Sequence, residues 1–219
     1  LKGKQGMLDI SYLQGHDGIP NKVGHGISDC YYDITPSPAI NFWSNVNFYG
    51  ALKAVIGVEK MAAAYGITDT TANIRHPYNM DERIQWTYSV TDLETILSDL
   101  KTNIEKPYVE GDYDWSEKGG FWDAKTGRFI QGITAEGNKL DYGYLHYNLE
   151  AISYGIGTDA QVKSIMDWID GDRIVEGDTS TGDDIYIFEF APRYSTVDNK
   201  KDYLWAYQKG GEGRLRFGD

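Results

Sequence analysis

A long helical periodicity near the start of the chain constrains the fold more than any other feature. Apolar residues recur through positions 39–65 at the spacing of one helix face, namely Phe42, Val46, Tyr49, Leu52 and Ile56. Ser37 followed by Pro38 is typical of a helix start, and Gly66 is typical of a helix end. We therefore predict one long helix between these two signals.

Capping boxes indicate further helices. Thr91–Glu94 opens an amphipathic segment that ends near Pro107, and Thr158–Gln161 opens another. A helix is also predicted over 141–154, closed by Gly155. Because only a four-residue link separates this helix from the next, we expect the two to form an antiparallel hairpin.

The segments between these helices favour turns and short strands. Residues 121–130 are typical of two short strands around a turn, and 136–138 of a second turn. We interpret 68–88 as a polar connector and 1–35 as irregular. The expectation is a single domain over 1–219, mainly α-helical, with short β-hairpins in its loops.

Composition excludes several classes of function. The net charge of −12 argues against a nucleic-acid partner, and no apolar run reaches the length of a membrane helix. A lone Cys30 excludes an intrachain disulfide and a cysteine-based zinc site, and the four His residues lack metal-site spacing. The chain begins at Leu1, and we therefore expect a fragment, a processed form or an expressed portion.

Two features favour a carbohydrate ligand. The chain has 17 Tyr, 6 Trp and 7 Phe, and Tyr and Trp offer a flat apolar face with a polar edge that suits stacking on sugar rings. In addition, the segment 170–193 concentrates carboxylates around a glycine-rich turn. Clustered acid on a loop is typical of a sugar-cleaving or cation-binding site, but also of a merely solvated loop.

The order of these elements resembles a known family. FWDAKTGRF, a turn, DYGYLHYNLEAISYGI, a further helix and then a glycine-acid loop resemble the second half of six-hairpin (α/α)6 glycosidases of the amylo-glucosidase and debranching type. The segment 31–36 resembles the aromatic-Asp loop that carries a catalytic acid in several of those families. The resemblance implies an (α/α) toroid of helical hairpins, here with fewer hairpins than a full toroid has.

The resemblance also implies a glycoside hydrolase that uses carboxylate general acid/base chemistry. Asp33 would be the general acid, and Glu176 or Asp178 the base that activates water. Each of these residues can equally serve as a turn or loop residue without a catalytic role. Glu212 is a further candidate for the base.

A second group of residues is assigned to substrate binding. Asp141, Tyr142 and His146 lie at the mouth of a predicted helix, where they suit hydrogen bonds to sugar hydroxyls. Trp43, Trp122 and Tyr186 are candidates for stacking on a sugar ring. Arg193 is a candidate for orienting a carboxylate. Core packing is the alternative for Trp43, and pairing with the acidic loop is the alternative for Arg193.

A calcium site is a different use of clustered acids. Asp112, Asp114 and Glu117, or Asp170 with Asp172, supply oxygen ligands for calcium, although neither group has the EF-hand spacing. The chain would otherwise need no cofactor or metal. Two further functions stay open, namely a non-catalytic carbohydrate-binding domain and a polysaccharide lyase on the same toroid. We expect an extracellular or periplasmic location, although no signal segment opens the chain.

Overall fold

The computed structural model describes residues 38, 40–67, 71–75, 83–111, 119–134 and 137–176. Its helices in this part of the chain are α1 (Phe42–Ala64), α2 (Val90–Glu105), α3 (Leu145–Tyr154) and α4 (Asp159–Ile169). Its strands are β1 (Ile40–Asn41), β2 (Thr71–Arg75), β3 (Arg83–Thr87), β4 (Trp122–Asp123), β5 (Arg128–Phe129), β6 (Gly132–Ile133) and β7 (Lys139–Leu140). No helix in these ranges is long and apolar enough to cross a membrane.

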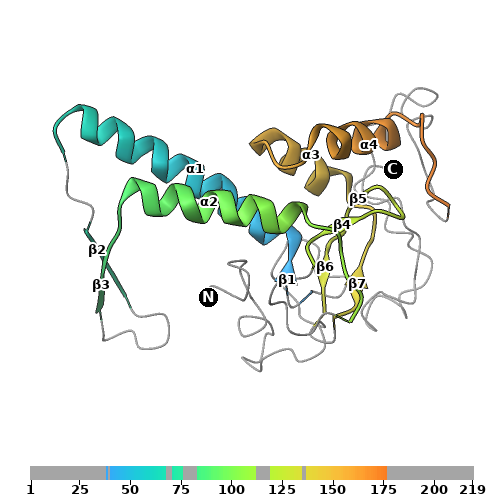
Figure 1. The fold of residues 1–219 in the computed structure, drawn as a ribbon, viewed down its shortest axis with the longest axis horizontal. Coiled ribbons are helices and arrows are strands. Elements are labelled where there is room, and N and C mark those ends of the chain that lie inside the picture. Colours follow the sequence, from blue (N-terminus) through green and yellow to red (C-terminus); the bar gives the residue numbers. More distant parts are fainter. Residues whose placement is uncertain are drawn as a thin grey trace, which may run out of the picture.

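The two longest helices, α1 and α2, lie side by side (Figure 1). Two polar contacts join their surfaces near the end of α1. The Tyr88 hydroxyl donates to the Glu59 carboxylate at 2.7 Å, and the Lys60 ammonium lies 2.6 Å from the Glu94 carboxylate. These contacts are partly or fully exposed, so burial of the apolar faces between the helices supplies most of the stabilisation.

The start of α1 differs from the prediction. α1 begins at Phe42, and Asn41 is its N-cap: the Asn41 side-chain oxygen accepts from the Ser44 N–H at 2.9 Å. The predicted helix start at Ser37-Pro38 is wrong because β1 pairs with β6 and holds residues 40–41 extended. The helix end is confirmed, since Gly66 has a φ of +79° just beyond the last turn.

Both capping boxes exist, one of them displaced. α2 begins at Val90, and its box is formed by Ser89 and Asp92 rather than by Thr91 and Glu94. The hydrogen bond from the Ser89 hydroxyl holds the pKa of the Asp92 carboxyl below its ordinary value. The box formed by Thr158 and Gln161 opens α4 as predicted.

The predicted polar connector over 68–88 is partly wrong. It contains the antiparallel hairpin of β2 and β3, paired from Thr71↔Thr87 to Arg75↔Arg83. The hairpin lies near the ends of α1 and α2 that are remote from the other strands (Figure 1). The segment is polar on average, but it includes residues with high strand propensity, such as Ile74, Ile84 and Trp86. The prediction considered only the average and therefore missed the two strands.

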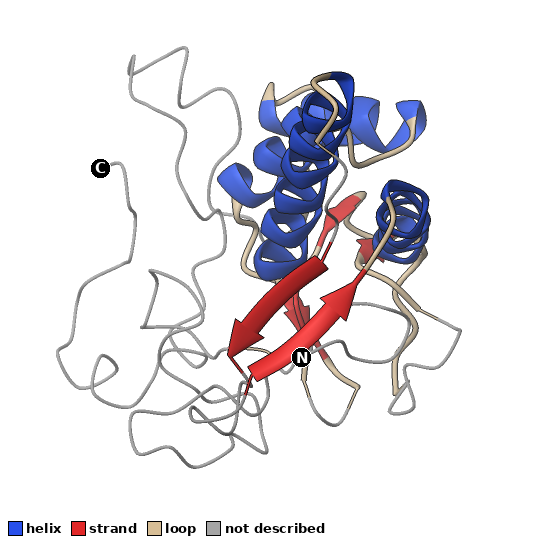
Figure 2. Cartoon of the chain, turned by 90° about the vertical axis from the view of Figure 1, so that its left-hand side faces the viewer, coloured by secondary structure: helices blue, strands red, loops and turns tan. Residues whose placement is uncertain are grey.

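The short strands between α2 and α3 confirm the predicted hairpins. β4 pairs antiparallel with β5, and β1, β6 and β7 form an antiparallel sheet in the order β1-β6-β7. Gly127 has a φ of +62° in the β4–β5 turn, and Gly137 one of +81° in the β6–β7 turn, a conformation that favours glycine. In Figure 2 the two large arrows nearest the viewer are β2 and β3, and the short strands lie behind them.

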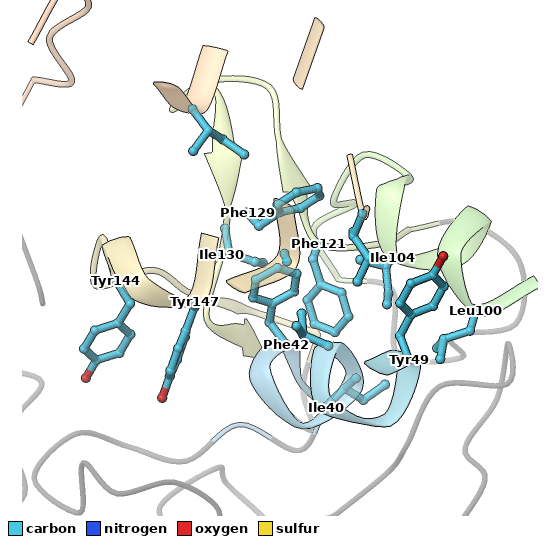
Figure 3. Close-up of a cluster of buried hydrophobic side chains, with 14 of the residues drawn as sticks. Ile40, Phe42, Tyr49, Leu100, Ile104, Phe121, Phe129, Ile130, Tyr144 and Tyr147 are labelled. Atoms are coloured by element: carbon cyan, nitrogen blue, oxygen red, sulfur yellow. The ribbon is translucent and has the colours of Figure 1, made fainter. Parts of the chain in front are cut away.

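The core forms where α1 meets the β4–β5 hairpin (Figure 3). The Phe42 ring lies 5.3 Å from the Phe121 ring and 5.0 Å from the Phe129 ring, centroid to centroid. Asn148 of α3, also buried, accepts from the Phe129 N–H at 2.9 Å and donates to the Phe129 carbonyl at 3.2 Å. The core therefore joins helices to strands rather than helices to helices alone.

This arrangement contradicts the predicted (α/α) toroid. A toroid requires successive helical hairpins that pack side by side, but a β-hairpin separates α1 from α2 and four short strands separate α2 from α3. The strand segments carry core residues such as Phe121 and Ile130, so they are part of the framework and not loops on a helical one. The predicted fold class is therefore wrong over the part of the chain that is described.

Candidate functional site

Five rings gather where the segment before α3 meets the first turn of α1. We call Trp43, Tyr142, Tyr144, His146 and Tyr147 the aromatic cluster. Tyr147 is its centre, with ring centroids 5.6 Å from Trp43, 4.8 Å from Tyr144 and 4.2 Å from His146. Trp43 and Tyr147 are stacked, with 12° between their planes. The cluster is thus continuous from α1 to α3.

The five rings differ in exposure. Tyr142, Tyr144 and Tyr147 are buried, whereas Trp43 and His146 are half-buried. The hydroxyls of Tyr144 and Tyr147 point to the same side, away from the phenylalanine core (Figure 3). Trp43 and His146 are therefore the more exposed members of the cluster, although both ring nitrogens of His146 are buried.

His146 is uncharged at neutral pH. Burial lowers the pKa of its imidazole from 6.5 to about 4, because the charged form loses solvation among the tyrosine rings. A neutral imidazole offers one donor and one acceptor nitrogen. Both of these nitrogens are buried within the protein.

Trp43 is oriented by a carboxylate of α3. Its indole N–H donates to Glu150 at 2.6 Å, and the Tyr154 hydroxyl lies 3.5 Å from the other carboxylate oxygen of Glu150. Tyr147 covers one face of the indole. The polar edge of Trp43 is thus held within the protein, while the residue as a whole is half-buried.

A buried ion pair supports the segment that carries the tyrosines. The Arg128 guanidinium, only 2% exposed, lies 3.1 Å from the Asp141 carboxylate and 4.6 Å from the centre of the Trp168 ring. Asp141 also accepts from the Gly143 N–H at 3.1 Å. Asp141 therefore fixes the turn into α3, and its charge is balanced by Arg128.

A second carboxylate, Asp123, is committed to the β4–β5 turn. Burial by itself would raise its pKa, but hydrogen bonds from Lys139, the Lys125 N–H and the Thr126 hydroxyl outweigh that effect and lower it. A general acid needs a raised pKa instead. Asp123 is thus a structural residue.

The predicted substrate-binding residues have different outcomes. Trp43, Tyr142 and His146 come together in the aromatic cluster, and Asp141 lies beside it but is bound to Arg128. Trp122 packs edge-on against Phe129 at 5.3 Å in the β4–β5 hairpin.

The predicted catalytic residues are mostly outside the described part of the chain. Glu176 is exposed at the end of the described range that begins at residue 137. The remaining predicted site residues lie outside the described residues, namely Asp33, Asp178, Tyr186 and Arg193. Glu212 and most of the acidic segment lie there too.

The calcium hypothesis has no support in the ranges that are described. No group of three or more His, Cys, Asp or Glu side chains with metal-binding geometry occurs among these residues. Asp170 and Asp172 are both exposed. Asp112, Asp114 and Glu117 lie outside the described ranges.

Sequence reasoning missed several residues that build this region. Arg128 lies in the segment 121–130, which was predicted as two short strands around a turn, and no motif there indicates a buried ion pair. Tyr147 and Glu150 carry no motif; Glu150 lies one helical turn after His146, and both lie on α3, which begins at Leu145.

No protein-family model, curated protein or solved structure matches this chain. The predicted relationship to six-hairpin glycosidases is thus wrong: the fold lacks the toroid in its described part, and no match supports it. The catalytic roles that this resemblance implied for Asp33, Glu176 and Asp178 lose that support.

Proposed function

We propose that the chain is a carbohydrate-binding protein whose ligand contacts the aromatic cluster at Trp43 and His146. The proposal rests on one observation: the half-buried rings of Trp43 and His146 both contact the buried ring of Tyr147. Pyranose rings present C–H groups that pack on aromatic faces and hydroxyls that bond to polar edges.

The charges around the cluster favour an uncharged sugar. Asp141 is paired with Arg128, and Glu150 accepts from Trp43. His146 carries no charge at neutral pH because its pKa is about 4. An anionic sugar would meet the carboxylate of Glu150 and a neutral imidazole, which counts against a polysaccharide lyase.

The residues beside the aromatic cluster favour binding of a sugar without its hydrolysis. The carboxylates beside the cluster, Asp141 and Glu150, are both engaged in contacts that hold the framework. Hydrolysis stays a prediction that depends on Asp33 and on Glu176 or Asp178. Hydrolysis would be shown by the release of reducing ends from a glycan by the chain, and by the loss of this release in the Asp33→Asn and Glu176→Gln variants.

The test is a binding screen with the full chain against soluble neutral oligosaccharides and insoluble polysaccharides. For a glycan that binds, we expect Trp43→Ala to weaken affinity by about tenfold or more, a typical effect of removing a stacking ring. Trp122→Ala is the matched control, because this indole is also half-buried but packs against Phe129. Thermal unfolding of both variants reports whether the fold is retained.

Two outcomes contradict the proposal. One is that no neutral glycan binds the chain. The other is that Trp43→Ala and Trp122→Ala, both folded, bind the glycan as the unaltered chain does. A Trp43→Phe variant, which preserves more of the packing on Tyr147, separates loss of stacking from loss of folding.

A further inference from the structure

The carboxylate of Glu150 orients the Trp43 indole, and the position of this carboxylate depends in turn on a second residue of α3. One Glu150 oxygen accepts from the Trp43 indole N–H at 2.6 Å, and the other lies 3.5 Å from the Tyr154 hydroxyl. A glutamate side chain has several rotatable bonds, so contacts at both oxygens confine the carboxylate more than a contact at one. Tyr154 therefore contributes to the orientation of Trp43 through Glu150.

Tyr154 is itself placed by a glycine of α1. A Cβ added at Gly50 would lie 2.9 Å from two atoms of the Tyr154 ring, closer than a real Cβ comes to its neighbours. The tyrosine ring thus lies directly on the backbone of α1, an approach that any side chain at position 50 would prevent. One turn further along α1, the Lys53 ammonium donates to the Tyr154 carbonyl at 2.6 Å and holds the same end of α3.

These contacts form one connected row between α1 and α3. Trp43 and Gly50 lie seven residues, or two turns, apart on one face of α1. Tyr147 and Tyr154 have the same spacing on α3. Tyr147 stacks on Trp43 at one end of the row, and Tyr154 lies on Gly50 at the other. Because Glu150 lies between them, a displacement of Tyr154 reaches Trp43 through Glu150.

We propose that Gly50 and Tyr154 are positioning residues for Trp43, which they hold through Glu150 in the orientation that binds the sugar. The sugar in this inference rests on the proposed function, whereas the contacts do not. A ring that is fixed before the ligand arrives loses little freedom on binding, so positioning of this kind raises affinity.

The indole N–H signal of Trp43 in NMR spectra of the full, unliganded chain tests the positioning, because this proton reports the hydrogen bond to Glu150. We expect Gly50→Ala, which pushes the Tyr154 ring away, to move the signal and to accelerate its exchange with solvent. Gly57→Ala is the matched control on the same helix, since nothing among the described residues lies within 4 Å of its added methyl group. A signal that stays in place in Gly50→Ala, or that moves equally in Gly57→Ala, overturns the proposal.

Further variants test whether the effect passes through Tyr154 and Glu150. Tyr154→Phe keeps the ring but removes the hydroxyl contact, so it should also move the Trp43 signal. Glu150→Gln keeps an acceptor oxygen and should keep the indole N–H protected from exchange, whereas Glu150→Leu should not. In a Glu150→Leu background, Gly50→Ala should move the signal no further. If it still does, or if Tyr154→Phe leaves the signal in place, the proposal is wrong.

The consequence for the ligand is measured with the neutral oligosaccharide that binds in the screen. We expect Gly50→Ala to raise its dissociation constant by about threefold or more, and Gly57→Ala to leave it unchanged. An unchanged dissociation constant in Gly50→Ala contradicts a positioning role in binding. If no neutral glycan binds the unaltered chain, the proposed function fails, and the NMR comparison still decides whether Gly50 and Tyr154 position Trp43.

Discussion

At the residue scale, His146 is a side chain of the described region whose charge depends strongly on its surroundings. Its pKa of about 4 in the folded chain lies below the value of 6.5 for an ordinary imidazole. The unfolded chain therefore binds more protons between these two pH values. The contribution of His146 to stability is complete above pH 6.5 and is lost as the pH falls toward 4.

We predict an NMR titration midpoint near pH 4 for the His146 imidazole. Between pH 6.5 and 4, the free energy of unfolding should fall by about 2 kcal/mol from this group, after allowance for its partial exposure. In His146→Gln, which does not titrate, that part of the pH dependence should vanish. A midpoint near 6.5 would show that the imidazole is solvated and not enclosed by the tyrosines.

The buried ion pair of Arg128 and Asp141 contributes to the stability of the fold. Asp141→Ala leaves a buried guanidinium without its counter-charge, so we expect it to lower the free energy of unfolding by about 3–5 kcal/mol. Urea denaturation measures the change. Adding Arg128→Met to this variant should recover part of the loss, because the uncompensated charge is removed. If the double variant is no more stable than Asp141→Ala, the cost does not come from the unpaired charge.

At the element scale, the two glycines of α1 allow a matched comparison. Gly57→Ala should stabilise the fold by about 1 kcal/mol, because alanine favours helix and the added methyl has open space. Gly50→Ala should stabilise it less or destabilise it, since the Tyr154 ring must move. Thermal unfolding compares the two. A larger gain at Gly50 would contradict the packing of α3 on α1.

The N-cap of α2 gives a second prediction at this scale. Ser89→Ala removes the acceptor for the Asp92 N–H and should lower the free energy of unfolding by about 1 kcal/mol. Thr91→Ala, at the position that the sequence predicted as the cap, is the control and should cost much less. A larger loss for Thr91→Ala than for Ser89→Ala would show that the helix begins at the predicted residue.

The helices were predictable because their signals are local. The apolar spacing of Phe42, Val46 and Tyr49 and the box at Thr158 depend only on residues within a few turns of one another. The start of α1 was not predictable in the same way. Ile40–Asn41 is held extended by pairing with Gly132–Ile133, a contact between segments far apart in the chain.

The candidate site was predictable only in part, for the same reason. Tyr142 and His146 are close in sequence, and Trp43 was singled out as an aromatic side chain, but nothing local indicates that Tyr147 joins them. Asp141 was predicted to bind substrate, but it is paired with Arg128. The pair could not be predicted, because no spacing rule links a residue of a short strand to a residue of the loop before α3.

At the scale of the whole molecule, the short strands decide the architecture. They join α1 to the β4–β5 hairpin through Phe42, Phe121 and Phe129, and they leave no place for the side-by-side hairpins of a toroid in the described part of the chain. The same arrangement leaves Trp43 half-buried at the edge of the aromatic cluster.

Contact between a neutral sugar and the Trp43 and His146 rings can be followed by NMR of the indole and imidazole groups during titration with a glycan that binds. We predict that the signals of Trp43 and His146 shift together and saturate with the binding isotherm, whereas the indole of Trp168, buried against Arg128, stays in place. Saturable binding that leaves the Trp43 and His146 signals unchanged would contradict such contact.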